Sequence, residues 1–212
     1  PLRHDRMPVE EMYPFLEGQT LAEFYDNFMH SSASILLLIG PPGTGKTTFI
    51  RGLLQHSEAS AIVSYDSNVL EKDYVFANFI EGEKNVLVLE DADMFLKARA
   101  EGNTMMHKFL NVGDGLVTTR NKKLIFSTNL PSIRDIDPAL IRPGRCYDIL
   151  HFEELTQVQA EKLATKVGTK LNRERESWSI ADVFFEQNTN TKKTIERKMG
   201  FVWSMKFPTN IN

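Results

Sequence analysis

A glycine-rich segment from Gly40 to Thr47, reading GPPGTGKT, carries the residues in this sequence that are best suited to chemistry. Its three glycines allow positive φ angles and a close approach of the backbone, so that successive amide N–H groups can point at phosphate oxygens. Lys46 adds a mobile cation for the β and γ phosphates, and the Thr47 hydroxyl is placed to ligate magnesium. The pattern predicts a site for ATP with Mg2+. The expected nucleotide contacts are Gly40, Pro41, Pro42, Gly43, Thr44, Gly45, Lys46, Thr47 and Thr48.

Two acidic residues follow an apolar run of strand length, Val86 to Leu89. Glu90 and Asp91 stand where a parallel strand delivers its side chains to the carboxyl edge of a sheet. One acid is expected to hold the water shell of the metal, and the other to orient the attacking water and accept its proton. The candidate metal-site residues are therefore Thr47, Glu90 and Asp91, and a solvated acidic turn is the alternative.

An asparagine and two arginines extend the candidate catalytic set. Asn129 follows the apolar run Lys123 to Ser127, and its amide could hydrogen-bond both the γ-phosphate and the lytic water, although an isolated asparagine is more often a turn residue. Arg142 and Arg145 lie in DPALIRPGR, a loop from which guanidinium groups could neutralise charge on a γ-phosphate. The alternative is that these arginines are exposed and contribute only to solubility. The candidate catalytic residues are Lys46, Glu90, Asp91, Asn129, Arg142 and Arg145.

Apolar runs of strand length alternate with helical patterns through the first 152 residues. The expected strands are Ile35 to Ile39, Ala61 to Tyr65, Val86 to Leu89, Lys123 to Ser127 and Ile149 to Phe152. The expected helices are Leu21 to His30, Thr47 to Leu54, Tyr74 to Ile80 and Met105 to Leu110. Strands separated by helices of this length predict an α/β fold with a doubly wound, parallel, five-stranded sheet.

After about Glu153 the pattern becomes helical and predicts a small C-terminal helical lid. Apolar residues recur at near-helical spacing at Leu155, Val158, Leu163 and Val167. A second apolar helix is expected at Ile180 to Phe185, and the short polar stretch Asn188 to Thr191 is expected to form a loop.

These elements predict three parts. The expected parts are an N-terminal segment with an amphipathic helix (1–30), a nucleotide-binding core (31–153), and the lid with its tail (154–212). The tail from Lys192 to Asn212 is either a docked or frayed end, or a peptide that binds a partner.

The composition is that of an ordinary globular protein, with 42% hydrophobic residues, 25% charged residues and a formal net charge of -3. Such a charge provides no basic field for nucleic acid. The single cysteine, Cys146, excludes an internal disulfide and any cysteine-based zinc site. No apolar run reaches the length of a membrane span, and Pro1 to His4 lack the order of a signal peptide, so we expect a cytoplasmic protein.

Four segments in this order resemble the AAA family of ATPases: GPPGTGKT, VLVLEDAD, FSTN and DPALIRPGR. The resemblance covers about Ile35 to Phe152. Within the family, the sequence looks closest to the mitochondrial Rieske-protein translocase group and its viral and prokaryotic relatives. That group likewise carries a Glu-Asp order after the strand and a segment similar to FLNVGDG, found here at Phe109 to Gly115.

The resemblance implies a role for each candidate residue. The implied Walker A, Walker B and sensor 1 residues are Lys46 with Thr47, Glu90 with Asp91, and Asn129. Arg142 and Arg145 would be arginine fingers that face the nucleotide of a neighbouring subunit, which implies a homo-oligomeric ring, expected to be a hexamer. The commonest family order is Asp then Glu, so the roles of the two acids stay open; the shorter side chain of Asp91 favours it as the base.

The resemblance also implies an ATP-hydrolysing motor that remodels or translocates a macromolecule, with a protein partner favoured over nucleic acid. Tyr74 is a weak candidate for an aromatic pore residue, with core packing as the alternative, and Lys97 to Asn103 resembles a charged pore loop. Two other functions stay open, a DNA-transaction ATPase of the helicase or clamp-loader type and a slow ATP-dependent assembly switch. The near-neutral charge argues against the first of these.

Overall fold

The computed structural model describes residues 7–16, 18–65, 73–96, 106–113 and 122–191. The strands are β1 (Ile35–Ile39), β2 (Ala61–Ser64), β3 (Val86–Leu89), β4 (Lys123–Thr128) and β5 (Cys146–His151). The helices are α1 (Leu21–His30), α2 (Lys46–His56), α4 (Asp73–Glu81), α5 (Asp93–Leu96), α6 (Met106–Gly113), α7 (Gln157–Lys166) and α8 (Ile180–Thr191). Two short 3-10 helices are η1 (Glu10–Met12) and η3 (Ile133–Asp135).

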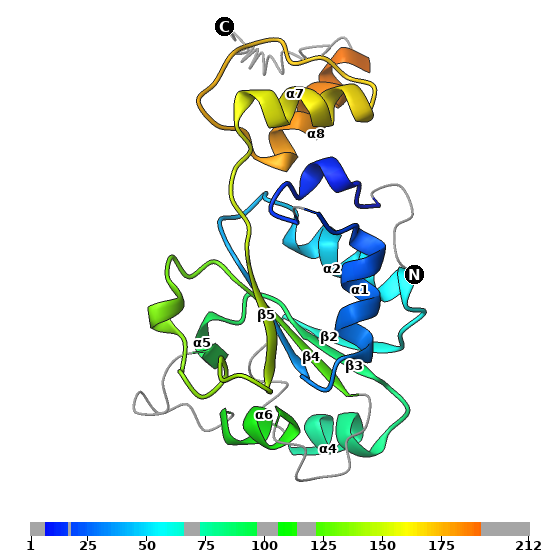
Figure 1. Ribbon diagram of the computed structural model, residues 1–212, viewed down its shortest axis with the longest axis vertical. Helices are drawn as coiled ribbons and strands as arrows, with labels where there is room; N and C mark the ends of the chain where they lie inside the picture. Colours follow the sequence, from blue (N-terminus) through cyan, green and yellow to red (C-terminus); the bar gives the residue numbers. More distant parts are fainter. Residues whose placement is uncertain (1–6, 17, 66–72, 97–105, 114–121, 192–212) are drawn as a thin grey trace, which may run out of the picture.

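The five strands form one parallel sheet in the order β2-β3-β4-β1-β5 (Figure 1). All five residues of β1 are buried, which is the pattern of a parallel strand covered on both faces. Because the strands are parallel, their carboxyl ends meet at one edge of the sheet. The glycine-rich loop, the acids after β3 and Asn129 after β4 are thereby delivered to the same edge.

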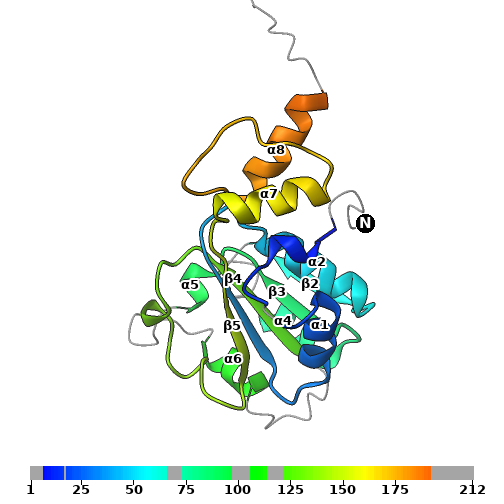
Figure 2. The same cartoon turned by 45° about the horizontal axis from the view of Figure 1, so that its top comes forward.

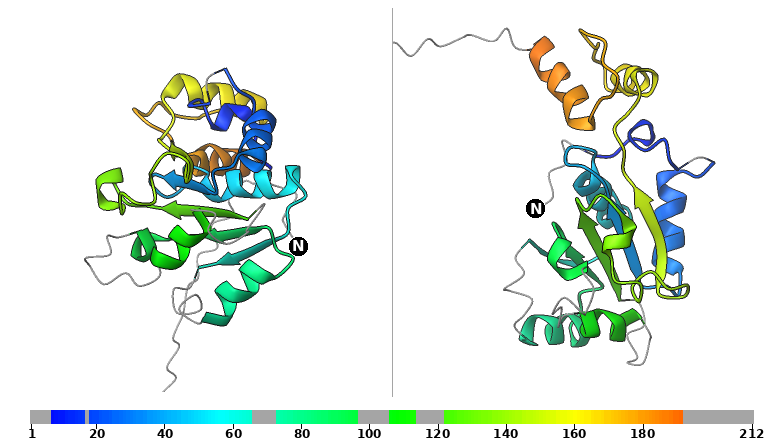
Figure 3. Two further views of the ribbon diagram at one scale, coloured as in Figure 1. Left: turned by 60° about the horizontal axis from the view of Figure 1, so that its bottom comes forward. Right: turned by 90° about the vertical axis from the view of Figure 1, so that its left-hand side faces the viewer.

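Helices cover both faces of the sheet (Figure 3). On one face Leu36 and Leu38 pack in a core with residues of α1 and α2, and on the other Leu37 packs with residues of α4, α5 and α6. The expected α/β fold with a doubly wound, parallel, five-stranded sheet is thus confirmed. Within the part of the chain that the structure describes, no helix has the length and apolar character needed to span a membrane.

Element boundaries follow the sequence closely where a local signal exists. Helix α1 has the expected bounds because Thr20 and Glu23 form a reciprocal capping box at its start. Strand β5 differs, since it begins at Cys146 rather than Ile149 and ends before Phe152. It is an edge strand, and its exposed Asp148 interrupts the apolar run from which its extent was predicted.

The C-terminal helices differ from expectation in three places. Leu155 lies outside α7, in a backbone bridge to Trp178, and Val158 on α7 is 61% exposed. Asn188 to Thr191 continue α8 instead of forming a loop. Asn and Thr lower helix propensity by less than about 1 kcal/mol each, so an established helix can extend through them. The two helices lie together beyond the edge of the sheet that carries the glycine-rich loop (Figure 2).

The N-terminal segment joins this helical pair to the core. Glu11 in η1 pairs with Lys166 at the end of α7, with 3.4 Å between Oε1 and Nζ. Tyr13 is buried, and its ring packs edge-on against Phe49 and Phe152, with centroids 5.2 Å and 5.7 Å away. These contacts hold the segment beside the start of α2.

Candidate nucleotide-binding site

The loop between β1 and α2 requires glycine at two positions. A β-carbon on Gly40 would lie 2.1 Å from the carbonyl oxygen of Phe152, so no larger residue fits there. Gly45 caps the start of α2 with a φ of 90°, a left-handed conformation that favours glycine. Helix α2 then begins at Lys46, and the N–H groups of its first turn lack helical partners. A helix start after such a loop is suited to binding an anion.

The ammonium group of Lys46 is held by neutral oxygens around the loop. Nζ donates to the carbonyl oxygens of Gly40 and Pro41, at 2.5 Å and 2.9 Å, and to Oδ1 of Asn129 at 2.9 Å. Burial lowers the pKa of Lys46, while the three carboxylates that follow β3 act in the opposite direction. Because every partner is uncharged, a phosphate could replace them with a stronger, charge-assisted hydrogen bond.

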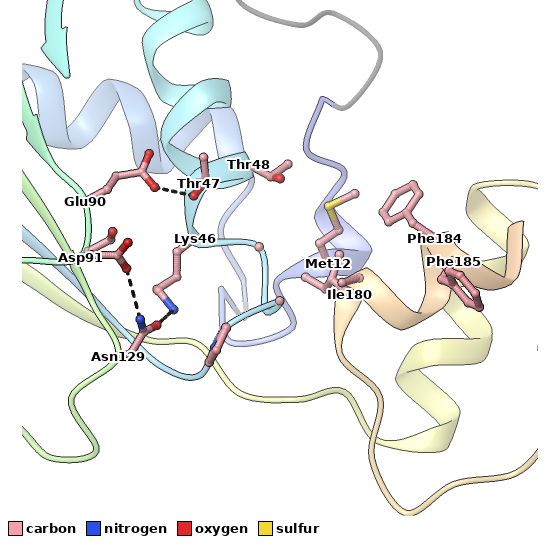
Figure 4. Close-up of a pocket in the computed structure, with 15 residues that line it drawn as sticks. Met12, Lys46, Thr47, Thr48, Glu90, Asp91, Asn129, Ile180, Phe184 and Phe185 are labelled. Atoms are coloured by element: carbon pink, nitrogen blue, oxygen red, sulfur yellow. Dashed lines mark hydrogen bonds between the residues drawn. The ribbon is translucent and has the colours of Figure 1, made fainter. Parts of the chain in front are cut away.

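The two acids after β3 contact different partners (Figure 4). The Thr47 hydroxyl donates to Glu90 Oε2 at 2.6 Å, and Asn129 Nδ2 donates to Asp91 Oδ1 at 3.2 Å. Asp91 has a φ of 52°, a left-handed backbone conformation in which Asp is enriched. The structure therefore brings all five candidate catalytic and metal-site residues outside the arginine loop into one cluster, with Thr48 on the neighbouring wall.

The oxygen donors at this edge fit magnesium. A hydroxyl and a carboxylate are ligand types that Mg2+ prefers, usually together with waters and substrate phosphates. Thr47 and Glu90 already lie within hydrogen-bonding distance of each other. Asp91 was included in the expected metal set, but its Oδ1 lies against Asn129 instead of against this pair.

A cavity of about 460 Å³ lies between the loop and α8. One part of its lining consists of the loop and the strand-end polar groups. The other part includes apolar residues that were not predicted to belong to the site, Met12 from η1 and Ile180, Ala181, Phe184 and Phe185 from α8 (Figure 4). An apolar pocket with a few convergent polar groups is the usual form of a small-ligand site. Here the division matches a purine base at one end and phosphates at the other.

Hydrogen bonds attach both flanking segments to the loop. The Ala181 N–H, at the start of α8, donates to the Gly43 carbonyl at 3.1 Å. The Tyr13 hydroxyl donates to the Gly45 carbonyl at 3.1 Å, and burial raises the pKa of Tyr13, which keeps that proton in place. The sequence marked 180–185 as an apolar helix, but nothing in it indicated contact with a loop more than 130 residues earlier.

The two arginines lie at the opposite end of the sheet. The Arg145 carbonyl accepts a hydrogen bond from the N–H of Ile35, the first residue of β1, whereas the glycine-rich loop follows the last. A strand of this length spans on the order of 15 Å. Arg145 Nη1 donates to the Ala139 carbonyl at 2.8 Å, and Arg142 is exposed. The structure therefore does not bring the arginines to the chain's own Lys46.

Three expectations cannot be followed in the described residues. The proposed pore segment Lys97 to Asn103 and the tail 192–212 lie outside them. Tyr74 belongs to α4, but its side chain is also outside the described part.

A glycine-rich loop after β1 of a parallel sheet, with two acids after β3 at the same edge, defines a P-loop nucleotide-binding protein. Residues 36–154 match the ATPase family associated with various cellular activities (AAA), and the chain belongs to this family. The expectation of an AAA-type ATPase is thereby confirmed.

Curated relatives of this chain include regulatory subunits of the proteasome. The 26S proteasome regulatory subunit 8 of Caenorhabditis elegans is 31% identical over 140 residues, covering 58% of this chain and 33% of that protein. The subunit 8 homolog of Saccharomyces cerevisiae is 26% identical over 178 residues, covering 71% of this chain and 43% of that protein. The chain thus spans less than half the length of these relatives. They give no support to the narrower likeness to the Rieske-protein translocase group.

Proposed function

We propose that this chain binds ATP with Mg2+, hydrolyses it, and acts as one subunit of a ring-forming motor. One observation carries the proposal: Asn129 is hydrogen-bonded to both Lys46 and Asp91, beside the contact between Thr47 and Glu90. These groups line a single cavity together with the glycine-rich loop. The ammonium group of Lys46, the side-chain amide of Asn129 and the carboxylate of Asp91 are therefore grouped where a terminal phosphate would lie.

In binding, the backbone N–H groups of residues 43–48 would surround the phosphates, and Lys46 would exchange its carbonyl partners for phosphate oxygens. The purine base of the nucleotide would lie between Met12 and the start of α8, where Ile180 and Ala181 provide apolar surface. Because Ala181 is also bonded to the loop through Gly43, the base and phosphate ends of the site are tied together.

In hydrolysis, Asp91 would accept a proton from a water molecule that Asn129 orients. The water oxygen bonds to the γ-phosphorus, the bond from that phosphorus to the β–γ bridging oxygen breaks, and ADP leaves with the bridging oxygen. The contact between Asp91 and Asn129 supports this assignment of the base. Glu90, which contacts Thr47, would hold the metal's water shell. Bound magnesium would neutralise charge developing on the phosphate oxygens.

Assembly into a ring follows from the position of the arginines in this proposal. Arg142 and Arg145 lie at the far end of the sheet from the chain's own loop, so in this proposal they act at the nucleotide of a second subunit. A homo-oligomeric hexamer and a protein substrate are part of the proposal. The names of the relatives, as regulatory subunits of a proteasome, support assembly into a larger protein machine.

We further propose the division into a segment 1–30, a core 31–153 and a lid with tail 154–212, and a cytoplasmic location.

Steady-state ATP turnover over a range of chain concentrations tests this function. Since each complete site needs two subunits, turnover per subunit should rise with concentration and level off as rings form, and chelating magnesium should abolish it. Appreciable turnover that is independent of concentration would contradict the shared site. Adding an unfolded protein in parallel with single-stranded DNA separates the motor from a DNA-transaction ATPase, because only the expected partner should stimulate hydrolysis.

A further inference from the structure

The third acid after β3, Asp93, has no place in the proposed chemistry and does not line the cavity. Its carboxylate nevertheless contacts the neighbouring strand end. Asp93 Oδ1 accepts hydrogen bonds from the Thr128 hydroxyl at 2.5 Å and from the backbone N–H of Asn129 at 3.3 Å. Thr128 is fully buried, so this contact is shielded from water.

These bonds lie just beyond the end of the regular pairing between the two strands. The β3–β4 ladder ends at Leu89 and Phe126. After it, the Ala92 N–H donates to the Ser127 carbonyl at 2.8 Å, and the Asp93 carboxylate binds the next two residues. The hydroxyl of Thr128 also accepts from the Leu130 N–H at 3.1 Å, which fixes the chain on the other side of Asn129.

The side chain of Asn129 depends on this backbone, because it must reach two partners at once. Its Oδ1 lies 2.9 Å from Lys46 Nζ and its Nδ2 lies 3.2 Å from Asp91 Oδ1. Asn129 is exposed, so packing gives it little support. A small rotation of its backbone would break one contact or both.

We propose that Asp93 is a positioning residue that holds Asn129 between Lys46 and Asp91. The inference rests on the proposed function only for its effect on turnover, because the hydrogen bonds that carry it join the chain's own residues. Asp93 does not touch the reacting atoms. It acts by fixing the backbone of Asn129. The side-chain amide of Asn129 then contacts both the ammonium group of Lys46 and the carboxylate of Asp91.

Turnover of a double-mutant cycle tests whether Asp93 acts through Asn129. Asp93→Ala should lower kcat about 10-fold or more with little change in KM, since misplacing a group by about 1 Å can cost up to 10²-fold. Asp93→Asn, which keeps an oxygen acceptor, should retain most of the activity. In an Asn129→Ala background, Asp93→Ala should add little further loss. A loss that is undiminished in that background, or one confined to KM, would overturn the proposal.

Nuclear magnetic resonance of the nucleotide-free chain, with asparagine labelled by nitrogen-15, gives a second readout that needs no hydrolysis. The side-chain amide signal of Asn129, assigned by its absence in Asn129→Ala, should shift and broaden in Asp93→Ala and stay near its parent position in Asp93→Asn. Thr128→Val removes one donor to Asp93 and also the acceptor for the Leu130 N–H. It should still shift the Asn129 signal, and it serves as the test if Asp93→Ala unfolds the chain. An Asn129 signal unmoved in both Asp93→Ala and Thr128→Val refutes the positioning role, whereas an inactive parent chain with the expected shifts refutes only the proposed function.

Discussion

Replacing Asp91 with asparagine is expected to lower ATP turnover about 10²- to 10⁴-fold, because the amide cannot accept the proton of the attacking water. ATP binding should survive, since the loop, Lys46 and Thr47 are unchanged. Asparagine tolerates the left-handed backbone at this position and keeps an oxygen that can accept from Asn129 Nδ2. Steady-state hydrolysis and equilibrium ATP binding, measured on the same preparation, check both parts of the prediction.

Glu90→Gln is the matched control for that substitution. Because Glu90 contacts Thr47 and not Asn129, its amide variant should mainly raise the magnesium concentration needed for half-maximal turnover. The opposite pattern, in which Glu90→Gln stops hydrolysis at every magnesium concentration and Asp91→Asn only shifts the magnesium requirement, would exchange the two roles. The sequence left this choice open, and the two side-chain contacts favour Asp91 as the base.

Replacing Arg142 with alanine is expected to lower turnover about 10³-fold or more while ATP binding persists, as for loss of an arginine finger. Arg142 is exposed and distant from its own loop, so the loss should arise at a neighbour's site. Turnover and nucleotide binding of Arg142→Ala, together with its size in solution, provide the measurement.

Mixing two inactive variants shows whether the arginine acts between subunits. An Asp91→Asn subunit keeps its finger, and an Arg142→Ala subunit keeps its base. Equal mixing into rings should therefore restore about one quarter of parent turnover, the fraction of random interfaces with both parts intact. Co-assembled rings with no recovery would mean that Arg142 serves its own subunit or has no catalytic part. Arg134→Ala, an exposed arginine on η3, is a suitable control and should leave turnover near the parent value.

Local signals made most of the core predictable from the sequence. The bounds of α1 and β3 agree with expectation because a capping box and a continuous apolar run mark them. The loop and the acids could be placed at one edge because parallel strands share their direction. The hydrogen bond between Asp91 and Asn129 could not be predicted, because it depends on how the turns after β3 and β4 meet beyond the last paired residues of these strands.

The apolar half of the cavity was also beyond prediction, for a different reason. Met12 and Ile180 come from opposite ends of the chain, and each looks like an ordinary core residue in its own helix. They become site residues only because η1 and α8 pack against the same glycine-rich loop through Tyr13 and Ala181. No periodicity or spacing in the sequence encodes such a contact between distant segments.

Titration calorimetry of ATP with magnesium, on the parent chain and on Lys46→Ala, tests the central claim most directly. The account predicts saturable binding to the parent and an affinity about 10- to 100-fold weaker for Lys46→Ala, the cost of a charged hydrogen bond. Lys162→Ala, which removes an exposed lysine on α7, should bind like the parent. No heat of binding with the folded parent, or equal affinities for the parent and Lys46→Ala, would contradict the account.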